Sequence, residues 1–187
     1  MMIKYLREST EPLHQELEQV LIPRIKQTNT QAAYISLLQL FYGYYYPLEQ
    51  YIAAHLDTTF PGGFDQRRKA SLLLQDMAAI NGAPVEPPPL CTDIPEIADA
   101  GQALGALYGL ERAALGEEVI SQLLHNVPDV AKAFTFFEGY GTNSQAMWDS
   151  FEHYLDGYNG TDVQKARLIQ SAVDTFLKFK LWASAAK

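Results

Sequence analysis

The side chains of this sequence best suited to bind a metal are its four histidines, His14, His55, His125 and His153. Two of these have a carboxylate at helical spacing, in Glu11-x-x-His14 and Asp149-x-x-x-His153. Carboxylate and histidine pairs contributed by several helices of a bundle form the ligand sets of di-iron sites. A ferritin-like site of this kind uses two Glu-x-x-His motifs, and the sequence contains one, so a di-iron centre stays an alternative.

His14 is the histidine whose surroundings are most informative. In TEPLHQELEQVL it lies beside leucines, at the margin of the apolar face of an expected helix. Arg7 precedes it by about two helical turns and shares its face only if the helix begins early enough. Pro12 leaves this open, because a helix capped at Ser9 or Thr10 accepts a proline in its first turn but leaves Arg7 outside.

Residues 101–118, GQALGALYGLERAALGEE, combine helical periodicity with four glycines, Gly101, Gly105, Gly109 and Gly116. Each glycine inside a helix costs about 1 kcal/mol relative to alanine, so four of them need a reason. At 100° per residue they fall within an arc of roughly 80°, and Arg112 lies in the middle of it. Such a stripe allows close approach of another helix or of a ligand. By itself the pattern favours helix packing.

The elements that must position these residues are helices. The 187 residues are 48% apolar and 12% aromatic, which suits one packed domain over residues 1–187. Helical periodicity dominates, and no alternating run is long enough to indicate a sheet, so we expect an all-α fold. The Pro-rich stretch at residues 81–95 is the one clear irregular connection.

Helix boundaries are marked by capping residues. Four helix starts are predicted, at Thr30, Asp65, Thr142 and Thr161, the last two within the capping boxes TNSQ and TDVQ. Pro47 is expected to kink or split the helix that follows Thr30.

The last helix shows two stripes. Its apolar stripe contains Ala166, Ile169, Val173 and Phe176. The opposite, polar stripe contains Arg167, Ser171, Asp174 and Lys178, and we expect it to face solvent.

Composition also limits the partners. The formal net charge of −8 argues against nucleic acid or an anionic membrane as a main partner, because both require phosphates to be neutralised. The N-terminal stretch MMIKYLREST lacks the apolar core of a signal peptide, and no apolar stretch is long enough to span a bilayer. The single cysteine, Cys91, excludes an internal disulfide, so we expect a cytoplasmic protein.

Several segments together resemble a known family. They are LRESTEPLHQELE around His14, LYGLERAALGEEVI, FFEGYG followed by MWDSFEHYL, and TFLKFKLW near the C-terminus. In this order, over nearly the whole chain, they resemble the bacterial haem oxygenase family, particularly the branch that includes the bacteriophytochrome-associated enzymes. The resemblance implies a single-domain, haem-oxygenase-like helical bundle with His14 as the proximal iron ligand.

The resemblance also implies a reaction. Haem would be both substrate and cofactor, cleaved oxidatively to biliverdin, carbon monoxide and ferrous iron, with electrons from an external donor such as a ferredoxin or a reductase. In this family the distal helix passes close over the haem, so the glycine stripe gains a second interpretation. On this interpretation the small residues, Gly109 and Gly116 among them, leave room for haem and dioxygen.

Further site residues follow from the resemblance. Four cations are candidates to pair with the haem propionates: Lys4, Arg7, Arg167 and Lys178. Two tyrosines, Tyr108 and Tyr140, are candidate hydrogen-bond donors in the pocket.

The sequence departs from the family pattern in the distal helix. Where the family has a run like Gly-Ser-x-Leu-Gly-Gly, this chain has RAALGE, so Arg112 and Glu117 occupy glycine positions while Gly116 is kept. Arg112 could pair with Glu111, Glu117 or a propionate, could lie over the iron as a distal donor, or could block haem. The favoured prediction is an active haem oxygenase with Arg112 and Gly116 in the catalytic site. The alternatives are a degenerate relative that binds haem or is purely structural, and a di-iron oxidase of the same fold.

Overall fold

The computed structural model describes residues 1–56, 60, 63–114, 117–124, 127–128 and 130–186. Within these ranges all regular structure is helical, which confirms the all-α prediction. The α-helices are α1 (Met2–Gln27), α2 (Gln31–His55), α3 (Ser71–Asn81), α4 (Ala100–Ala114), α5 (Glu117–Leu124), α6 (Thr135–Glu138), α7 (Ser144–Asp156) and α8 (Asp162–Ala185). Three short 3₁₀ turns are η1 (Phe64–Gln66), η2 (Val130–Lys132) and η3 (Gly141–Asn143).

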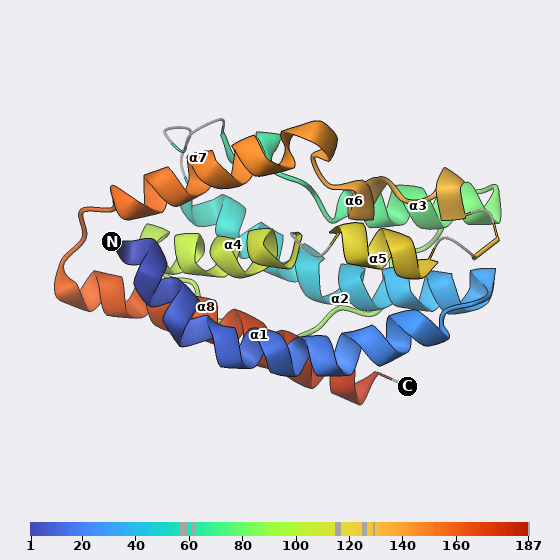
Figure 1. The fold of residues 1–187 in the computed structure, drawn as a ribbon, viewed down its shortest axis with the longest axis horizontal. Coiled ribbons are helices and arrows are strands. Elements are labelled where there is room, and N and C mark those ends of the chain that lie inside the picture. The colour runs from blue at the N-terminus through green and yellow to red at the C-terminus, as the bar shows by residue number, and fades with distance from the viewer. Residues whose placement is uncertain (57–59, 61–62, 115–116, 125–126, 129, 187) are drawn as a thin grey trace.

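The helices lie in a flat arrangement (Figure 1). In this view α1 and α8 run side by side along one edge, α7 and α3 lie along the opposite edge, and α4 and α2 lie between them. The helix α8 packs against both α4 and α1. The N-terminal end of α1 is also tied to α7, because the backbone N–H of Ile3 donates to the carboxylate of Asp156 at 3.0 Å. This arrangement places α1, the helix that carries His14, against α8 and α7.

Two of the four predicted helix starts are confirmed. Thr30 and Thr161 have extended backbones and accept hydrogen bonds from the backbone N–H groups of Ala33 and Gln164, and the box at Thr161 is complete. The other two are wrong. Asp65 lies in η1, six residues before α3 begins, and Thr142 lies inside η3, where the turn replaces the extended conformation that a cap needs.

The prolines do not break the helices that contain them. Because α1 begins at Met2, Pro12 lies inside it and Arg7 is on the same helix as His14, which settles the early start that Pro12 left open. The helix α2 continues through Pro47, so of the predicted kink or split the split is wrong and the kink stays a prediction. Each proline removes one helical hydrogen bond, and burial of the surrounding side chains offsets that loss.

The predicted irregular connection is present between α3 and α4. It passes close to α2 at Gly43, whose carbonyl accepts a hydrogen bond from the Cys91 N–H at 2.7 Å. A Cβ at Gly43 would lie 2.7 Å from the carbonyl oxygen of Pro89 and 2.7 Å from the indole ring of Trp182. Gly43 is therefore required by close approach of the backbone, one of the recognised uses of glycine.

The face that α8 turns toward the core differs from the prediction. Ala166 of the expected apolar stripe is exposed, whereas Ser171 of the expected polar stripe is buried. The Ser171 hydroxyl donates to the carbonyl of Gln102 in α4 at 2.7 Å. Ser171, Ala172 and Thr175 of α8 are small residues that lie against α4, where the glycines of α4 bring the two backbones close together.

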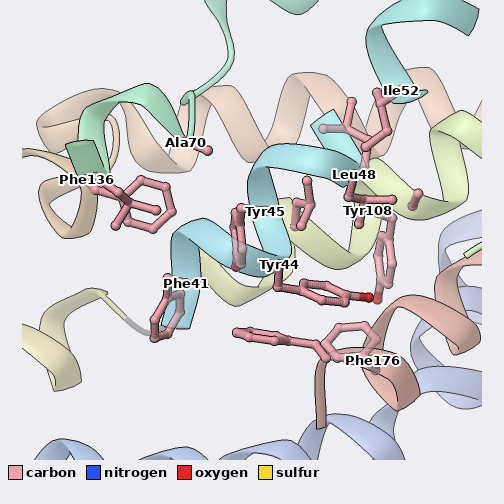
Figure 2. Close-up of a cluster of buried hydrophobic side chains, with 14 of the residues drawn as sticks. Phe41, Tyr44, Tyr45, Leu48, Ile52, Ala70, Tyr108, Phe136 and Phe176 are labelled. Carbon is pink, nitrogen blue, oxygen red and sulfur yellow. The ribbon is translucent and has the colours of Figure 1, made fainter. Parts of the chain in front are cut away.

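An aromatic core lies beside the candidate site (Figure 2). Tyr44 of α2 stacks on Phe179 of α8 with ring centroids 4.7 Å apart, and its hydroxyl donates to the carbonyl of Thr175 at 2.7 Å. Figure 2 shows Tyr44, Tyr108 and Phe176 gathered in this cluster from α2, α4 and α8. These rigid rings fix the position of α8, from which Phe176 reaches His14.

Candidate functional site

His14 of α1 has a half-buried imidazole, with 19% of its side chain exposed. The Phe176 ring meets it edge to face, with the centroids 5.4 Å apart. Its Nε2 lies 3.8 Å from a carboxylate oxygen of Glu18, one turn further along α1. Burial lowers the pKa of His14 and Arg112 lowers it further, while Glu18 and Glu11 partly oppose the shift. His14 is therefore neutral at pH 7, which is the form that binds a metal.

Arg112 reaches from α4 to α1. Its Nη2 donates to Glu11 Oε2 at 2.9 Å, and the second oxygen of Glu11 accepts from the Gln15 amide at 3.0 Å. The Gln15 hydrogen bond contributes most to lowering the pKa of Glu11, and the charge of Arg112 adds to it. Glu11 precedes His14 by three residues on the same helix. Of the hypotheses for Arg112, pairing is supported, but the partner is Glu11.

Two buried polar atoms of α4 lack well-formed hydrogen bonds to described residues. They are the hydroxyl of Tyr108 and the Nε of Arg112, one helical turn apart. Tyr108 is fully buried, and burial raises the pKa of its hydroxyl. Thr10 of α1 lies near that hydroxyl and partly opposes the rise of its pKa, and the Thr10 hydroxyl itself donates to the carbonyl of Leu6 at 2.7 Å. Because buried donors are normally paired, these two identify a polar region between α4 and α1 that suits a ligand or ordered water.

Glu111, the residue before Arg112, belongs to a separate buried network with Arg67 and Tyr140. The Tyr140 hydroxyl donates to Glu111 Oε1 at 2.7 Å, and Arg67 Nη1 lies 3.5 Å from Glu111 Oε2. The Arg67 guanidinium is sandwiched near the rings of Phe60 and Phe151, at 5.0 and 5.3 Å from their centroids. Glu111 thus pairs with Arg67 and not with Arg112. Sequence patterns gave no sign of Arg67, because its partners are distant in sequence.

The same network changes the interpretation of Tyr140. Besides donating to Glu111, its oxygen accepts the backbone N–H of Arg68 at 2.9 Å. Burial raises the pKa of Tyr140, and the charge of Glu111 raises it further. These two hydrogen bonds connect Tyr140 to α4 and to the segment before α3. The hydroxyl proton is already donated to Glu111, so Tyr140 is not a free donor in this structure.

The glycine stripe of α4 packs against protein. A Cβ at Gly105 would lie 2.0 Å from the carbonyl oxygen of Leu168, and one at Gly109 would lie 2.5 Å from the Thr175 methyl carbon, both on α8. At Gly101 it would lie 2.7 Å from the Tyr158 hydroxyl. The interpretation of Gly109 as a haem contact is therefore wrong in this structure. Helix packing, the other interpretation of the stripe, is correct for Gly105 and Gly109, whereas Gly101 lies against Tyr158 in the loop between α7 and α8.

The four candidate cations all have carboxylate partners away from His14. Lys4 lies 3.8 Å from Glu8, and Arg7 pairs with Glu152 of α7. On α8, Arg167 lies 3.6 Å from Asp99, and Lys178 donates to Asp93 at 2.6 Å and to the carbonyl of Ile94 at 3.0 Å. Arg167 and Lys178 thus tie α8 to the segment that precedes α4, and the structure does not bring them together with His14.

Part of the distal segment lies outside the described residues. Gly116 falls there, and so does the side chain of Glu117, the first residue of α5. Of the helix expected over residues 101–118, the structure describes α4 up to Ala114 and α5 from Glu117, and residues 115–116 lie outside the described residues. His125 also lies outside the described residues, while His153 is exposed on α7.

Comparison with known proteins decides the family. A family model described as heme oxygenase matches residues 1–185. The chain belongs to the haem oxygenase family. A search among curated proteins finds no match. The assignment of this haem oxygenase-family protein to the bacteriophytochrome-associated branch stays a prediction.

The family match covers the chain as a whole, and the role of His14 as the iron ligand, with Arg112 nearby, stays a prediction. Among the described residues, no three His, Cys, Asp or Glu side chains are grouped so that they could hold a metal ion. The Glu11-x-x-His14 motif therefore has no second set of ligands in that part of the chain, and Glu11 is engaged by Arg112. Within the same residues, no helix combines the length and apolar character needed to cross a membrane.

Proposed function

We propose that this haem oxygenase-family protein binds haem through His14, between α1 and α4, and cleaves it oxidatively to biliverdin, carbon monoxide and ferrous iron. The observation that carries the proposal is the half-buried His14 on α1, close to the Arg112 guanidinium of α4, whose Nε is buried without a hydrogen-bond partner among the described residues. The match of the family over residues 1–185 supports the same reaction class.

Haem suits the residues that are present. A neutral imidazole is a common axial ligand of haem iron, and His14 has the carboxylate of Glu18 near one ring nitrogen. Metal-binding histidines usually donate their second N–H to such a group, which fixes the tautomer. A small rotation of the Glu18 side chain would complete that hydrogen bond. Tyr108 and Arg112 would supply hydrogen-bond donors on the α4 side.

The protein residues have separate tasks in the proposed reaction. Bound haem supplies iron that activates dioxygen, with electrons from an external donor such as a ferredoxin or a reductase. His14 provides the lone pair, and Glu18 orients the ring by holding a proton on its other nitrogen. Phe176 limits rotation of the imidazole through its edge-to-face contact and excludes water from that side. Tyr108 and Arg112 set the polarity of the α4 side.

The ion pair between Glu11 and Arg112 favours a second candidate function. Because the guanidinium lies beside His14, it could restrict the space for dioxygen and leave a haem-binding protein without turnover. Replacing Arg112 by glycine separates the two candidates. If Arg112 obstructs the site, R112G binds hemin more tightly or turns it over faster than the natural protein, and no change in either would contradict obstruction.

The proposed function is tested by absorbance. Purified protein is titrated with hemin and then given ascorbate in air with catalase present. We expect a Soret band that depends on His14 and decays into biliverdin-like absorption. His14→Ala should abolish the band, whereas His153→Ala, which removes an exposed histidine of α7, should leave it unchanged.

The other outcomes are equally informative. A band that survives ascorbate would support the haem-binding protein without turnover. A band of equal intensity in the natural protein and in His14→Ala, or no band at all, would contradict the proposed function.

A further inference from the structure

The Glu11–Arg112 ion pair is a contact between two helices that pack mainly against other elements. The helix α4 packs mainly against α8 and α2, and α1 packs mainly against α8. Arg112 leaves this packing one turn after Gly109 and crosses to α1, where it binds the carboxylate three residues before His14. The ion pair therefore joins the two helices close to His14.

Two features of this ion pair allow it to break. Glu11 is 45% exposed and Arg112 is 18% exposed, and ion pairs with an exposed partner hold weakly because water competes for both charges. The Nε of Arg112 is buried without a partner, so the pair does not satisfy the guanidinium completely. The Gln15 amide donates to the second oxygen of Glu11, and this hydrogen bond would keep the carboxylate in its present position after Arg112 moves away.

We propose that the Glu11–Arg112 ion pair is a latch that closes the space beside His14 and opens when a ligand binds there. The inference rests on the proposed function, since it concerns access to the same site. Opening moves the guanidinium away from Glu11 and exposes His14. The unpaired Nε and the nearby Tyr108 hydroxyl then become available to the ligand or to water.

The latch is tested by the rate of hemin association in stopped-flow absorbance. Glu11→Gln weakens the pair and should raise the association rate about two- to fivefold, the range that corresponds to loss of a partly exposed ion pair. Arg112→Gln should raise it similarly. The double variant should be no faster than the faster single variant, because both changes remove one interaction.

Glu8→Gln is the matched control. Glu8 is exposed on the same helix and lies 3.8 Å from Lys4, away from Arg112. Its substitution removes the same charge as Glu11→Gln, so it reports how far the rate rises merely because anionic hemin is repelled less. The latch requires hemin to associate faster with Glu11→Gln than with Glu8→Gln. Added salt should reduce this difference in rate, because salt weakens the Glu11–Arg112 ion pair that is still present in Glu8→Gln.

A second measurement needs no haem. Diethyl pyrocarbonate acylates neutral, accessible imidazole, so the modification rate of His14 at pH 8 reports whether the latch is open. Glu11→Gln and Arg112→Gln should both accelerate modification of His14, with the exposed His153 as internal reference. Glu8→Gln should leave the rate unchanged.

The outcomes separate the latch from the proposed function. If Glu11→Gln associates no faster than Glu8→Gln, or if Arg112→Gln associates more slowly than the natural protein because Arg112 attracts the anionic ligand, the latch is refuted while haem binding stands. If no variant shows a His14-dependent Soret band, the proposed function fails. In that case faster modification of His14 in both latch variants still supports the latch, and an unchanged rate refutes it.

Discussion

Gly109 and Arg112 lie one turn apart in the same stripe of α4 and meet different neighbours. At Gly109 the backbone of α4 is so close to α8 that a single added carbon would lie 2.5 Å from the Thr175 side chain. At Arg112 a long side chain crosses to α1 and leaves its Nε buried and unpaired. The first position is determined by packing, whereas the second makes a polar contact between α4 and α1, beside the site that we propose. One stripe of a helix can therefore pack tightly in one turn and present a long polar side chain in the next.

The largest effect is expected where the packing is tightest. In Gly105→Ala the new Cβ would lie 2.0 Å from the Leu168 carbonyl oxygen, a backbone atom that can move only with α8 itself. We expect the free energy of unfolding to fall by about 3 kcal/mol or more, measured by urea denaturation. Gly101→Ala is the control, because the nearest atom there is the end of the Tyr158 side chain, which can rotate. Equal losses in the two variants would contradict close backbone packing at Gly105.

The next effect concerns a buried carboxylate packed near the far side of α4. Glu49 of α2 is buried, and burial raises its pKa to about 7 from the ordinary value of 4.5, although the Ala70 N–H, which donates to it at 2.7 Å, opposes the shift. A carboxyl group whose pKa is raised by folding takes up a proton between these values. Stability is therefore greatest below the unfolded pKa and falls as the pH rises toward 7.

Glu49→Gln should remove this pH dependence. The shift corresponds to about 3 kcal/mol, so the variant should be more stable than the natural protein at pH 8, by up to this amount, and lose the advantage near pH 4.5. Urea denaturation across this range measures the difference, and Glu86→Gln, at an exposed glutamate, should show no such trend. His14 titrates with the opposite sign in all three proteins and cancels in the comparison. A variant that is destabilised at every pH would show that Glu49 is required in its charged form.

A smaller effect is expected at Gly109, because its neighbour is a side chain. Gly109→Ala should destabilise the protein by about 2 kcal/mol through the clash with the Thr175 methyl group. Thr175→Ser removes that methyl group but keeps the hydroxyl that donates to the Ser171 carbonyl at 2.8 Å. The double variant should therefore be more stable than the sum of the single effects predicts, by about 1 kcal/mol in a double-mutant cycle. Strict additivity would show that the two positions are not in contact.

The sequence predicted the helical class and the elements that local signals define. Thr161 followed by Gln164 has a mechanism within four residues, and its capping box is present in the structure. Thr142 is likewise followed by glutamine three residues later, but it lies in a 3₁₀ turn. The contacts of Tyr140 with α4 and Arg68 fix the conformation of the chain just before it. Local signals therefore succeed where no tertiary contact overrides them.

The candidate site could be predicted only in part, for a related reason. His14 is a candidate because a sequence pattern and a family resemblance both point to it, and its role as a ligand stays a prediction. The partner of Arg112 was missed, since Glu11 lies 101 positions away in the sequence and no periodicity relates the two helices. The buried face of α8 was also misplaced, because a helix that packs on glycines buries Ser171 and Thr175 where periodicity favours larger apolar residues.

The smallest effect on stability is expected at Arg112, which makes it the sharpest test of the comparison with Gly109. Arg112→Gln removes an ion pair with a partly exposed partner and also an unpaired buried Nε, so the free energy of unfolding should change by less than about 1 kcal/mol. Arg167→Gln, which removes an exposed arginine 3.6 Å from Asp99, should behave alike in the same urea experiment. A loss comparable to that of Gly105→Ala would show that the ion pair holds α1 and α4 together, which a latch could not do. A negligible loss of unfolding free energy together with faster hemin association would assign Arg112 to the site. The stability of this part of α4 would then depend on the glycines that precede Arg112.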